Sequence, residues 1–178
     1  ETLREFCKGK PHVFFSCTQC ADKVQLGRFS KQLLKENIPA AQYISEFSDW
    51  EKAFRAILEL PYGDKKKLII VDEFPYMCKG NAAIPSILQN LWDEELKDSN
   101  VMIILCGSAM SFIEKELLAE KNPLYGRATG IYKMREMGFY DACKFFPDYT
   151  AREKVVAYAV LGGIPHYLNQ FRKELSLE

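Results

Sequence analysis

Residues 65–77, KKKLIIVDEFPYM, contain the stretch that decides the fold. Positions 68–71 hold four consecutive apolar residues, three of them β-branched, and such a run is typical of a strand inside a parallel sheet that is covered on both faces. The run stops at Asp72 and Glu73. Ligands of open α/β sheets bind beyond the carboxyl ends of the strands. The stretch therefore predicts a parallel sheet with two adjacent carboxylates at its ligand-binding edge.

This pair of carboxylates has the arrangement of a Walker B motif. Mg²⁺ prefers oxygen ligands, keeps most of its waters and takes few protein ligands, so Asp72 is the candidate magnesium ligand, directly or through water. Glu73 points elsewhere and is the candidate that orients or deprotonates a water attacking a γ-phosphate. Taken alone, the two residues leave open a second reading, in which they cap the next helix or merely end an apolar run at the surface.

Composition and charge limit the class of protein. The 178 residues are enough for about one domain with its own core, and 48% apolar with 27% charged residues is ordinary for a globular chain. A formal net charge of zero gives no basic field for nucleic acid. No apolar run approaches the length of a membrane span, no signal-peptide pattern opens the chain, and six irregularly spaced cysteines suit a reducing compartment. We therefore expect a cytoplasmic protein with no membrane partner.

Strand patterns and helix patterns alternate along the chain. The expected strands lie at residues 12–16, 68–71, 100–106 and 131–134, and the expected helices at 1–8, 23–36, 49–60, 85–97, 110–119 and 138–146, followed by a helical pair interrupted at 162–165. Alternation of this kind implies right-handed βαβ crossovers and an α/β fold with a parallel sheet.

Three stretches carry a family resemblance. LIIVDEFPYM at 68–77, CGSAMSFIEKELLAEKNPLYGR at 106–127 and LGGIPHYL at 161–168 resemble, in this order and spacing, the archaeal-type ATPase family, a branch of the AAA+/STAND P-loop ATPases. The resemblance covers essentially the whole chain. It implies a three-layer αβα P-loop NTPase core, which would be incomplete here and occupy residues 1–147, and the start of a small helical lid at residues 148–178.

The resemblance also implies parts that the 178 residues do not contain. Residues 1–6, ETLREF, align with the helix that follows the Walker A phosphate loop, so the loop and the strand before it would precede Glu1. That strand is expected between the strands at 100–106 and 131–134, and the sheet would therefore have a gap. We expect the natural protein to be longer at this end and to continue past Glu178 into a winged-helix segment and a further domain. We also expect the chain by itself to bind ATP poorly, because the phosphate loop supplies most of the phosphate contacts.

Within the core, the resemblance assigns roles to four residues. Asp72 resembles the Mg²⁺-organising carboxylate and Glu73 the catalytic one. Ser108 resembles the sensor that detects the γ-phosphate or the attacking water, although it can instead be a helix N-cap whose hydroxyl bonds the amide of Ser111. Arg127 resembles an arginine presented to the γ-phosphate, in cis or from a neighbouring subunit, and the alternative for it is a surface salt bridge.

Gly163 and Pro165 resemble the GxP motif of the STAND lid, in which the proline packs near the adenine. The alternative is a helix-breaking turn, which glycine and proline form in any protein. Elsewhere, Cys17 and Cys20 form one CxxC pair after a strand, the spacing of a redox pair.

The function expected from these observations is an ATP-binding and ATP-hydrolysing switch that uses Mg²⁺ and ATP in the intact protein. One alternative is a nucleotide-independent protein-interaction module on a degenerate P-loop fold, and another is a redox protein that uses Cys17 and Cys20. The expected partner is a nucleotide. Self-association or an unknown protein partner stays open, and nucleic acid is expected only through a carboxyl-terminal part beyond this chain.

Overall fold

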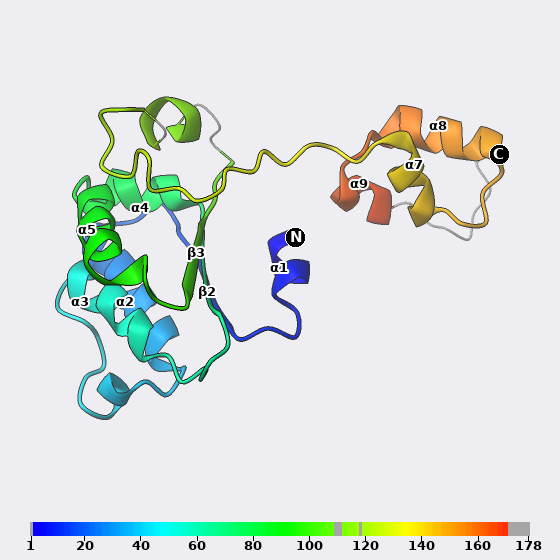
Figure 1. Ribbon diagram of the computed structural model, residues 1–178. Helices are drawn as coiled ribbons and strands as arrows, with labels where there is room; N and C mark the ends of the chain where they lie inside the picture. Colours follow the sequence, from blue (N-terminus) through cyan, green and yellow to red (C-terminus); the bar gives the residue numbers. More distant parts are fainter. Residues whose placement is uncertain (1, 109–111, 118, 171–178) are drawn as a thin grey trace. The chain divides into compact units, whose positions relative to one another are not determined.

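The computed structural model describes residues 2–108, 112–117 and 119–170 (Figure 1). The chain divides into two compact units, Glu1–Thr129 and Gly130–Glu178, and each is described by itself. Within the described residues, no helix combines the length and the apolar character needed to cross a membrane.

A parallel sheet of three strands forms the centre of the first unit. The strands are β1 (His12–Ser16), β2 (Lys67–Asp72) and β3 (Val101–Leu105), in the order β1-β2-β3. The register places Ser16 beside Asp72 and Val71 beside Leu105. All four residues at positions 68–71 are buried, as expected for a central strand of a parallel sheet. The predicted α/β class is confirmed.

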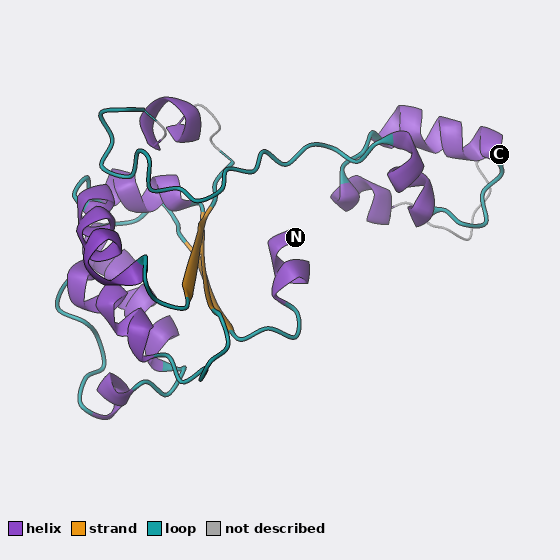
Figure 2. Ribbon diagram, in the orientation of Figure 1, coloured by secondary structure: helices purple, strands orange, loops and turns teal. Residues whose placement is uncertain are grey.

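One face of the sheet is covered by four helices, as Figure 2 shows. They are α2 (Asp22–Leu34), α3 (Trp50–Arg55), α4 (Phe74–Gly80) and α5 (Ile84–Leu91). Helix α3 continues as the 3-10 helix η2 (Ala56–Glu59), and α5 continues as the π-helix η3 (Trp92–Leu96). A separate 3-10 turn, η1, spans Pro39–Gln42. The core on this face centres on Phe29, whose ring lies 5.2 Å from that of Phe15 and 5.5 Å from those of Trp50 and Phe54.

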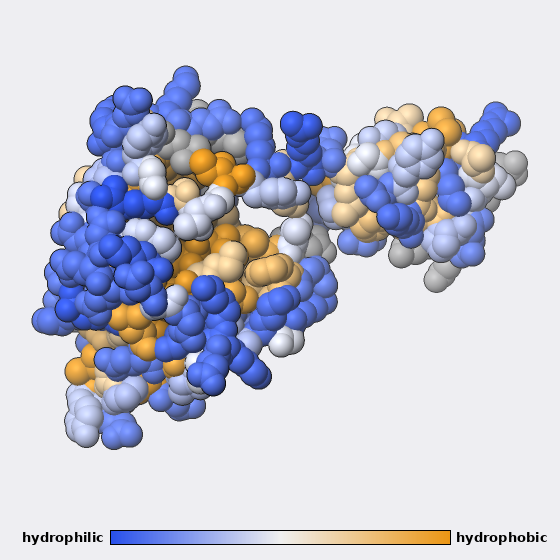
Figure 3. Space-filling view, viewed as in Figure 1, coloured by the Kyte–Doolittle hydropathy of each residue, from blue (hydrophilic) through white to orange (hydrophobic). Residues whose placement is uncertain are grey.

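Part of the opposite face of the sheet is covered by α1 (Thr2–Cys7). Its Cys7 packs with Leu68 and Ile70 of β2 in a separate small core. Farther along the same face, on β3, Met102 is 41% exposed, and apolar surface is visible between β3 and α1 in Figure 3. Helices on both faces give the first unit the predicted three-layer arrangement.

Two local predictions differ from the structure. The strand predicted at residues 131–134 is wrong: the segment has no strand partner among the described residues, and Tyr132 is 84% exposed. Its apolar residues suit a strand, but a strand forms only where a neighbour pairs its N–H and C=O groups. Helix α4 is not among the predicted helices; Pro75 lies in its first turn, a position where proline is well tolerated. Of the helix predicted at 110–119, the structure describes a π-helix, η4 (Ile113–Leu117), while residues 109–111 and 118 lie outside the described residues.

The second unit is helical. It contains α7 (Phe139–Ala142), the 3-10 helix η5 (Cys143–Phe145), α8 (Ala151–Leu161) and α9 (Pro165–Gln170). Thr150 forms the N-cap of α8, and with Glu153 it completes a capping box. The compact unit begins at Gly130, and its core joins Phe146 and Tyr149 to Ala157. The division into an ATPase core up to residue 147 and a lid from residue 148 stays a prediction.

Candidate functional site

Asp72 lies where β2 ends, and its carboxylate is held from one side. Its Oδ1 accepts a hydrogen bond from the backbone N–H of Glu73 at 3.1 Å and another from the thiol of Cys106 at 3.1 Å. Its backbone carbonyl accepts from the N–H of Cys17 at 2.8 Å, which ties the ends of β1 and β2 together. No described residue donates a hydrogen bond to Oδ2. One oxygen of the half-buried carboxylate is therefore anchored by the protein, and the other is available to a ligand.

Cys106 follows β3 and was not singled out in the sequence as a site residue. Burial, and next the hydrogen bond to Asp72, raise the pKa of the Cys106 thiol to about 12. The thiol therefore keeps its proton at neutral pH and acts as the donor to the carboxylate. The CGS motif placed this residue near the site, but only the parallel register of β2 and β3 shows which carboxylate it contacts.

Glu73 adopts an uncommon backbone conformation. Its φ of 52° and ψ of 41° lie in the left-handed region, at the N-cap position of α4. For a residue other than glycine this conformation costs on the order of 1 kcal/mol. Its Oε2 accepts a long hydrogen bond, 3.4 Å, from the backbone N–H of Ser108. Strained residues cluster at functional sites, so this conformation supports a functional reading of Glu73 over the capping reading, since its side chain caps no helix.

Ser108 thus lies beside Glu73 at the carboxyl edge of the sheet, with its backbone N–H directed at the carboxylate. The alternative reading, an N-cap bonded to Ser111, falls outside the described residues. Gly107, the residue before it, is required by close packing. A Cβ at this position would lie 2.7 Å from Cδ and 2.9 Å from Cγ of Pro75.

We predict that Gly107→Ala lowers the free energy of unfolding by about 1–3 kcal/mol, because Pro75 belongs to a packed helix and has to move. The measurement is urea denaturation followed by circular dichroism. Gly80→Ala is the matched control, since a Cβ there would meet its nearest atom, the carbonyl oxygen of Cys20, at an ordinary 3.6 Å. Equal stability of the two variants would contradict the packing argument.

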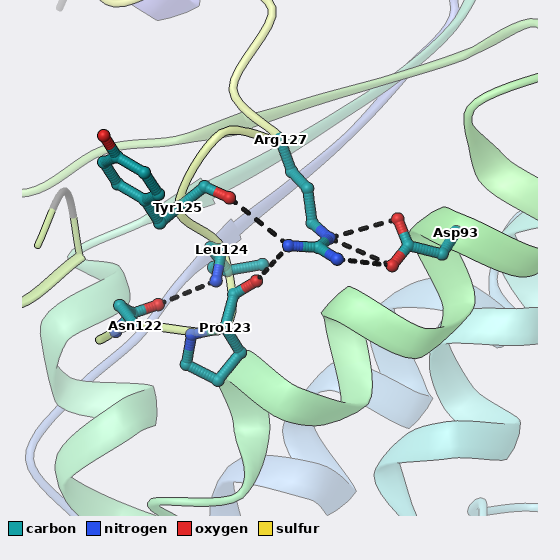
Figure 4. A network of polar contacts seen from close by, with 6 residues as sticks. All are labelled: Asp93, Asn122, Pro123, Leu124, Tyr125 and Arg127. Atoms are coloured by element: carbon teal, nitrogen blue, oxygen red, sulfur yellow. Dashed lines mark hydrogen bonds and ion pairs between the residues drawn. The ribbon is translucent and has the colours of Figure 1, made fainter. Parts of the chain in front are cut away.

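Arg127 forms an ion pair with Asp93 on η3, as Figure 4 shows. Its Nη2 lies 2.6 Å from Oδ2 of Asp93, and its Nε donates to both carboxylate oxygens at 3.0 and 3.1 Å. Its Nη1 donates to the carbonyl of Pro123 at 2.9 Å and to that of Tyr125 at 3.3 Å. The hydrogen bond from Arg127 lowers the pKa of Asp93. The structure thus places Arg127 in the salt bridge that was its alternative reading, and its contact with a phosphate stays a prediction.

Gly163 and Pro165 lie in the second unit, whereas Asp72, Glu73 and Ser108 lie in the first. A Cβ on Gly163 would lie 1.9 Å from the carbonyl oxygen of Met137, and the N–H of Met137 donates to the carbonyl of Gly163 at 2.9 Å. Pro165 begins α9. Backbone packing within the unit therefore accounts for this glycine, and the adenine contact of the motif stays a prediction.

We expect Gly163→Ala to destabilise the second unit by at least about 2 kcal/mol, because a methyl group cannot fit between two backbone segments that are hydrogen-bonded to each other. Hydrogen exchange of the α8 amides should become faster while exchange in β2 stays unchanged. Gly138→Ala is the control, since a Cβ there meets no atom within 4 Å. Unchanged exchange in α8 would contradict the expectation.

The CxxC segment is fixed by structural contacts. Gln25, which is 2% exposed, receives hydrogen bonds from the N–H of Thr18 and the thiol of Cys20 and donates to the carbonyl of Thr18, at 3.3–3.4 Å. Burial, and next the neighbouring Cys78, raise the pKa of Cys17 to about 12. A redox nucleophile requires a lowered thiol pKa. The redox alternative therefore has no support at Cys17.

The donor set at the sheet edge suits a hard cation with few protein ligands. The described residues contain no group of three or more His, Cys, Asp or Glu side chains arranged to hold a metal ion. Mg²⁺ in phosphate sites needs fewer, since one or two carboxylates, waters and the phosphates complete its shell. The free Oδ2 of Asp72 fits that requirement.

Over residues 5–171 the chain matches the family described as an ATPase domain predominantly from Archaea. The chain belongs to this family. An archaeal ATPase domain binds a nucleotide, and the carboxyl edge described above is where an α/β sheet places such a ligand.

Individual relatives of this archaeal ATPase domain are matched over only part of their own length. The uncharacterized protein MJECL04 of Methanocaldococcus jannaschii is 30% identical over 165 residues, which are 93% of this chain and 35% of that protein. The uncharacterized protein MJ0424 of the same organism is 44% identical over 46 residues, 26% of this chain and 45% of that protein. The solved structure of the Walker-type ATPase PABY2304 of Pyrococcus abyssi matches with a TM-score of 0.66 and 20% identity over 93% of this chain and 56% of that chain, which shows the fold. The chain spans less than two thirds of each of them.

Proposed function

We propose that this ATPase domain is the hydrolytic part of a Mg²⁺-dependent ATP switch of the AAA+/STAND type. The observation that carries the proposal is the carboxylate pair at the end of β2. Asp72 has one oxygen anchored by two donors and one oxygen free, and the adjacent Glu73 is held in a strained conformation beside Ser108. A capping role requires neither arrangement.

In this proposal Asp72 would hold Mg²⁺ through Oδ2, directly or through a water. A bound ion would neutralise the negative charge of the phosphates. The two donors on Oδ1, Cys106 and the Glu73 amide, keep the carboxylate in one orientation, so that no reorganisation of the ligand is needed when the nucleotide arrives.

Glu73 acts as the group that orients the attacking water and accepts its proton. The carboxylate is directed by the Ser108 amide, and Ser108 is the proposed sensor of the γ-phosphate because it is exposed at the same edge. The hydrogen bond between them, at 3.4 Å, is long enough to exchange for a water or a phosphate oxygen.

Arg127 is presented to the γ-phosphate, in cis or to that of a neighbouring subunit, and its positive charge stabilises the negative charge of the phosphoryl group. It first has to leave Asp93. Solvent reaches both groups and screens their attraction, which makes the exchange of this carboxylate for a phosphate feasible. The Gly163 to Pro165 turn would contact the adenine, and the nucleotide state would then set the position of the second unit as a lid.

The test is phosphate release from ATP by the full-length protein with its phosphate loop, in the presence of Mg²⁺ or of EDTA. Slow release that requires Mg²⁺ supports an ATP switch. If the protein binds ATP but releases no phosphate in either condition, it is a nucleotide-binding module and not a hydrolase. If it neither binds ATP nor releases phosphate, the proposal is overturned.

A further inference from the structure

Strand β1 is an edge of the sheet. It pairs with β2 on one side, and the other side has no strand among the described residues. The Cys17 N–H donates to the backbone carbonyl of Asp72, so the backbone groups of Cys17 point toward β2. Because the N–H and C=O groups of alternate residues point to opposite sides of a strand, the backbone groups of Phe14 and Ser16 point to the open side. The hydrogen bond from Nη2 of Arg28 to the Ser16 carbonyl, at 3.4 Å, agrees with this direction.

A groove of about 290 Å³ runs between this edge and helix α2. One wall is formed by residues of the strand and the other by long polar side chains of the helix. Neither wall contains a carboxylate. The lining residues are Phe14, Phe15, Ser16, Arg28, Lys31, Gln32 and Lys35.

The helix wall of the groove is positively charged. Arg28 and Lys31 of α2 and Lys35, its C-cap in helical conformation, are spaced three and four residues apart, which puts them on one face of the helix. Lys31 and Lys35 are exposed and form no ion pair with any residue that the structure describes. The chain as a whole has 24 basic and 24 acidic residues, so this face is a local excess and not part of a general basic character.

We propose that this groove, formed by the open edge of β1 and the basic face of α2, binds an extended acidic peptide segment of a partner protein by strand addition. The outward N–H and C=O groups of Phe14 would pair with the added backbone, and the two lysines would pair with its carboxylates. Opposite charge across such an interface steers encounter and fixes register. The proposal concerns the edge of the sheet and does not depend on nucleotide hydrolysis.

Two features favour a peptide over nucleic acid. An open edge offers directed backbone donors and acceptors, which an added strand satisfies and a phosphate chain does not. Binding of single-stranded nucleic acid uses exposed aromatic rings for stacking, whereas Phe15 is 4% exposed and the Phe14 ring is covered by Arg4 at 4.5 Å.

The test is a titration of the full ¹⁵N-labelled chain with a blocked eight-residue peptide of alternating glutamate and valine, followed by NMR. We expect shifts of the β1 amides and slower hydrogen exchange at Phe14. Lys31→Glu combined with Lys35→Glu should weaken the affinity at least about tenfold, because both changes reverse charges that face the ligand. Lys23→Glu, a single charge reversal on an exposed α2 residue outside the groove, should leave the affinity unchanged.

Two further probes separate strand addition from other binding. A peptide in which proline replaces valine keeps the charge but cannot pair as a strand, and a thymidine oligonucleotide supplies phosphates without a peptide backbone. The proposal is overturned if the acidic peptide does not bind, if the proline peptide binds equally well, or if the oligonucleotide binds more tightly and loses affinity through the same two lysines. In the first case, the lysines serve only to protect the edge from self-association.

Discussion

Glu73→Gln should bind Mg²⁺ and ATP as the unaltered full-length protein does and release phosphate about 10²–10⁴-fold more slowly, the usual contribution of a positioned general base. Glutamine keeps the shape of the side chain and can still accept the Ser108 N–H, but it cannot take a proton from water. The measurement is single-turnover phosphate release, with nucleotide affinity determined in parallel.

The control for this experiment is Glu59→Gln, which makes the same chemical change at an exposed residue of η2. It should leave both affinity and rate unchanged. If Glu73→Gln loses binding and turnover together, the carboxylate supports the structure of the site and not the chemistry. If it retains the full rate, the assignment of Glu73 is wrong.

Asp72→Asn should weaken ATP binding at least about tenfold in Mg²⁺ and have little effect in EDTA, because the amide keeps the size of the side chain and removes the charge that attracts the cation. Oδ1 of asparagine can still accept from Cys106 and from the Glu73 amide, so the fold around the site should persist. The measurement is ATP affinity as a function of Mg²⁺ concentration.

Asp98→Asn is the control, since Asp98 is exposed and precedes β3 at the opposite end of the strand. Its ATP affinity should follow that of the unaltered protein at every Mg²⁺ concentration. An Asp72→Asn protein whose affinity still rises with Mg²⁺ would contradict the role of Asp72 as the metal ligand.

The parts of the fold that the sequence predicted are those with a local cause. The run at positions 68–71 predicted a buried central strand, and the helix predicted from residue 49 begins in the structure at Trp50 with Asp49 as its N-cap. The side-chain oxygen of Asp49 accepts the Lys52 N–H at 2.8 Å. In these cases a few neighbouring residues decide the conformation.

The features that the sequence did not reveal depend on residues far apart in the chain. The segment 131–134 has strand composition but no partner strand, and pattern alone does not report a partner. Cys106 reaches Asp72, and Gly107 meets Pro75, only because β2 and β3 pair in one particular register. The left-handed backbone of Glu73 is likewise imposed by its surroundings, since no local pattern favours it for glutamate.

The measurement that tests the central claim most directly is a crystal structure of the full-length Glu73→Gln protein with Mg²⁺ and ATP, because this variant should retain the bound nucleotide. The account predicts the metal at Oδ2 of Asp72, directly or through one water, and a water between residue 73 and the γ-phosphate. A nucleotide bound away from the carboxyl edge of β2, or a metal that has no contact with Asp72, would contradict it.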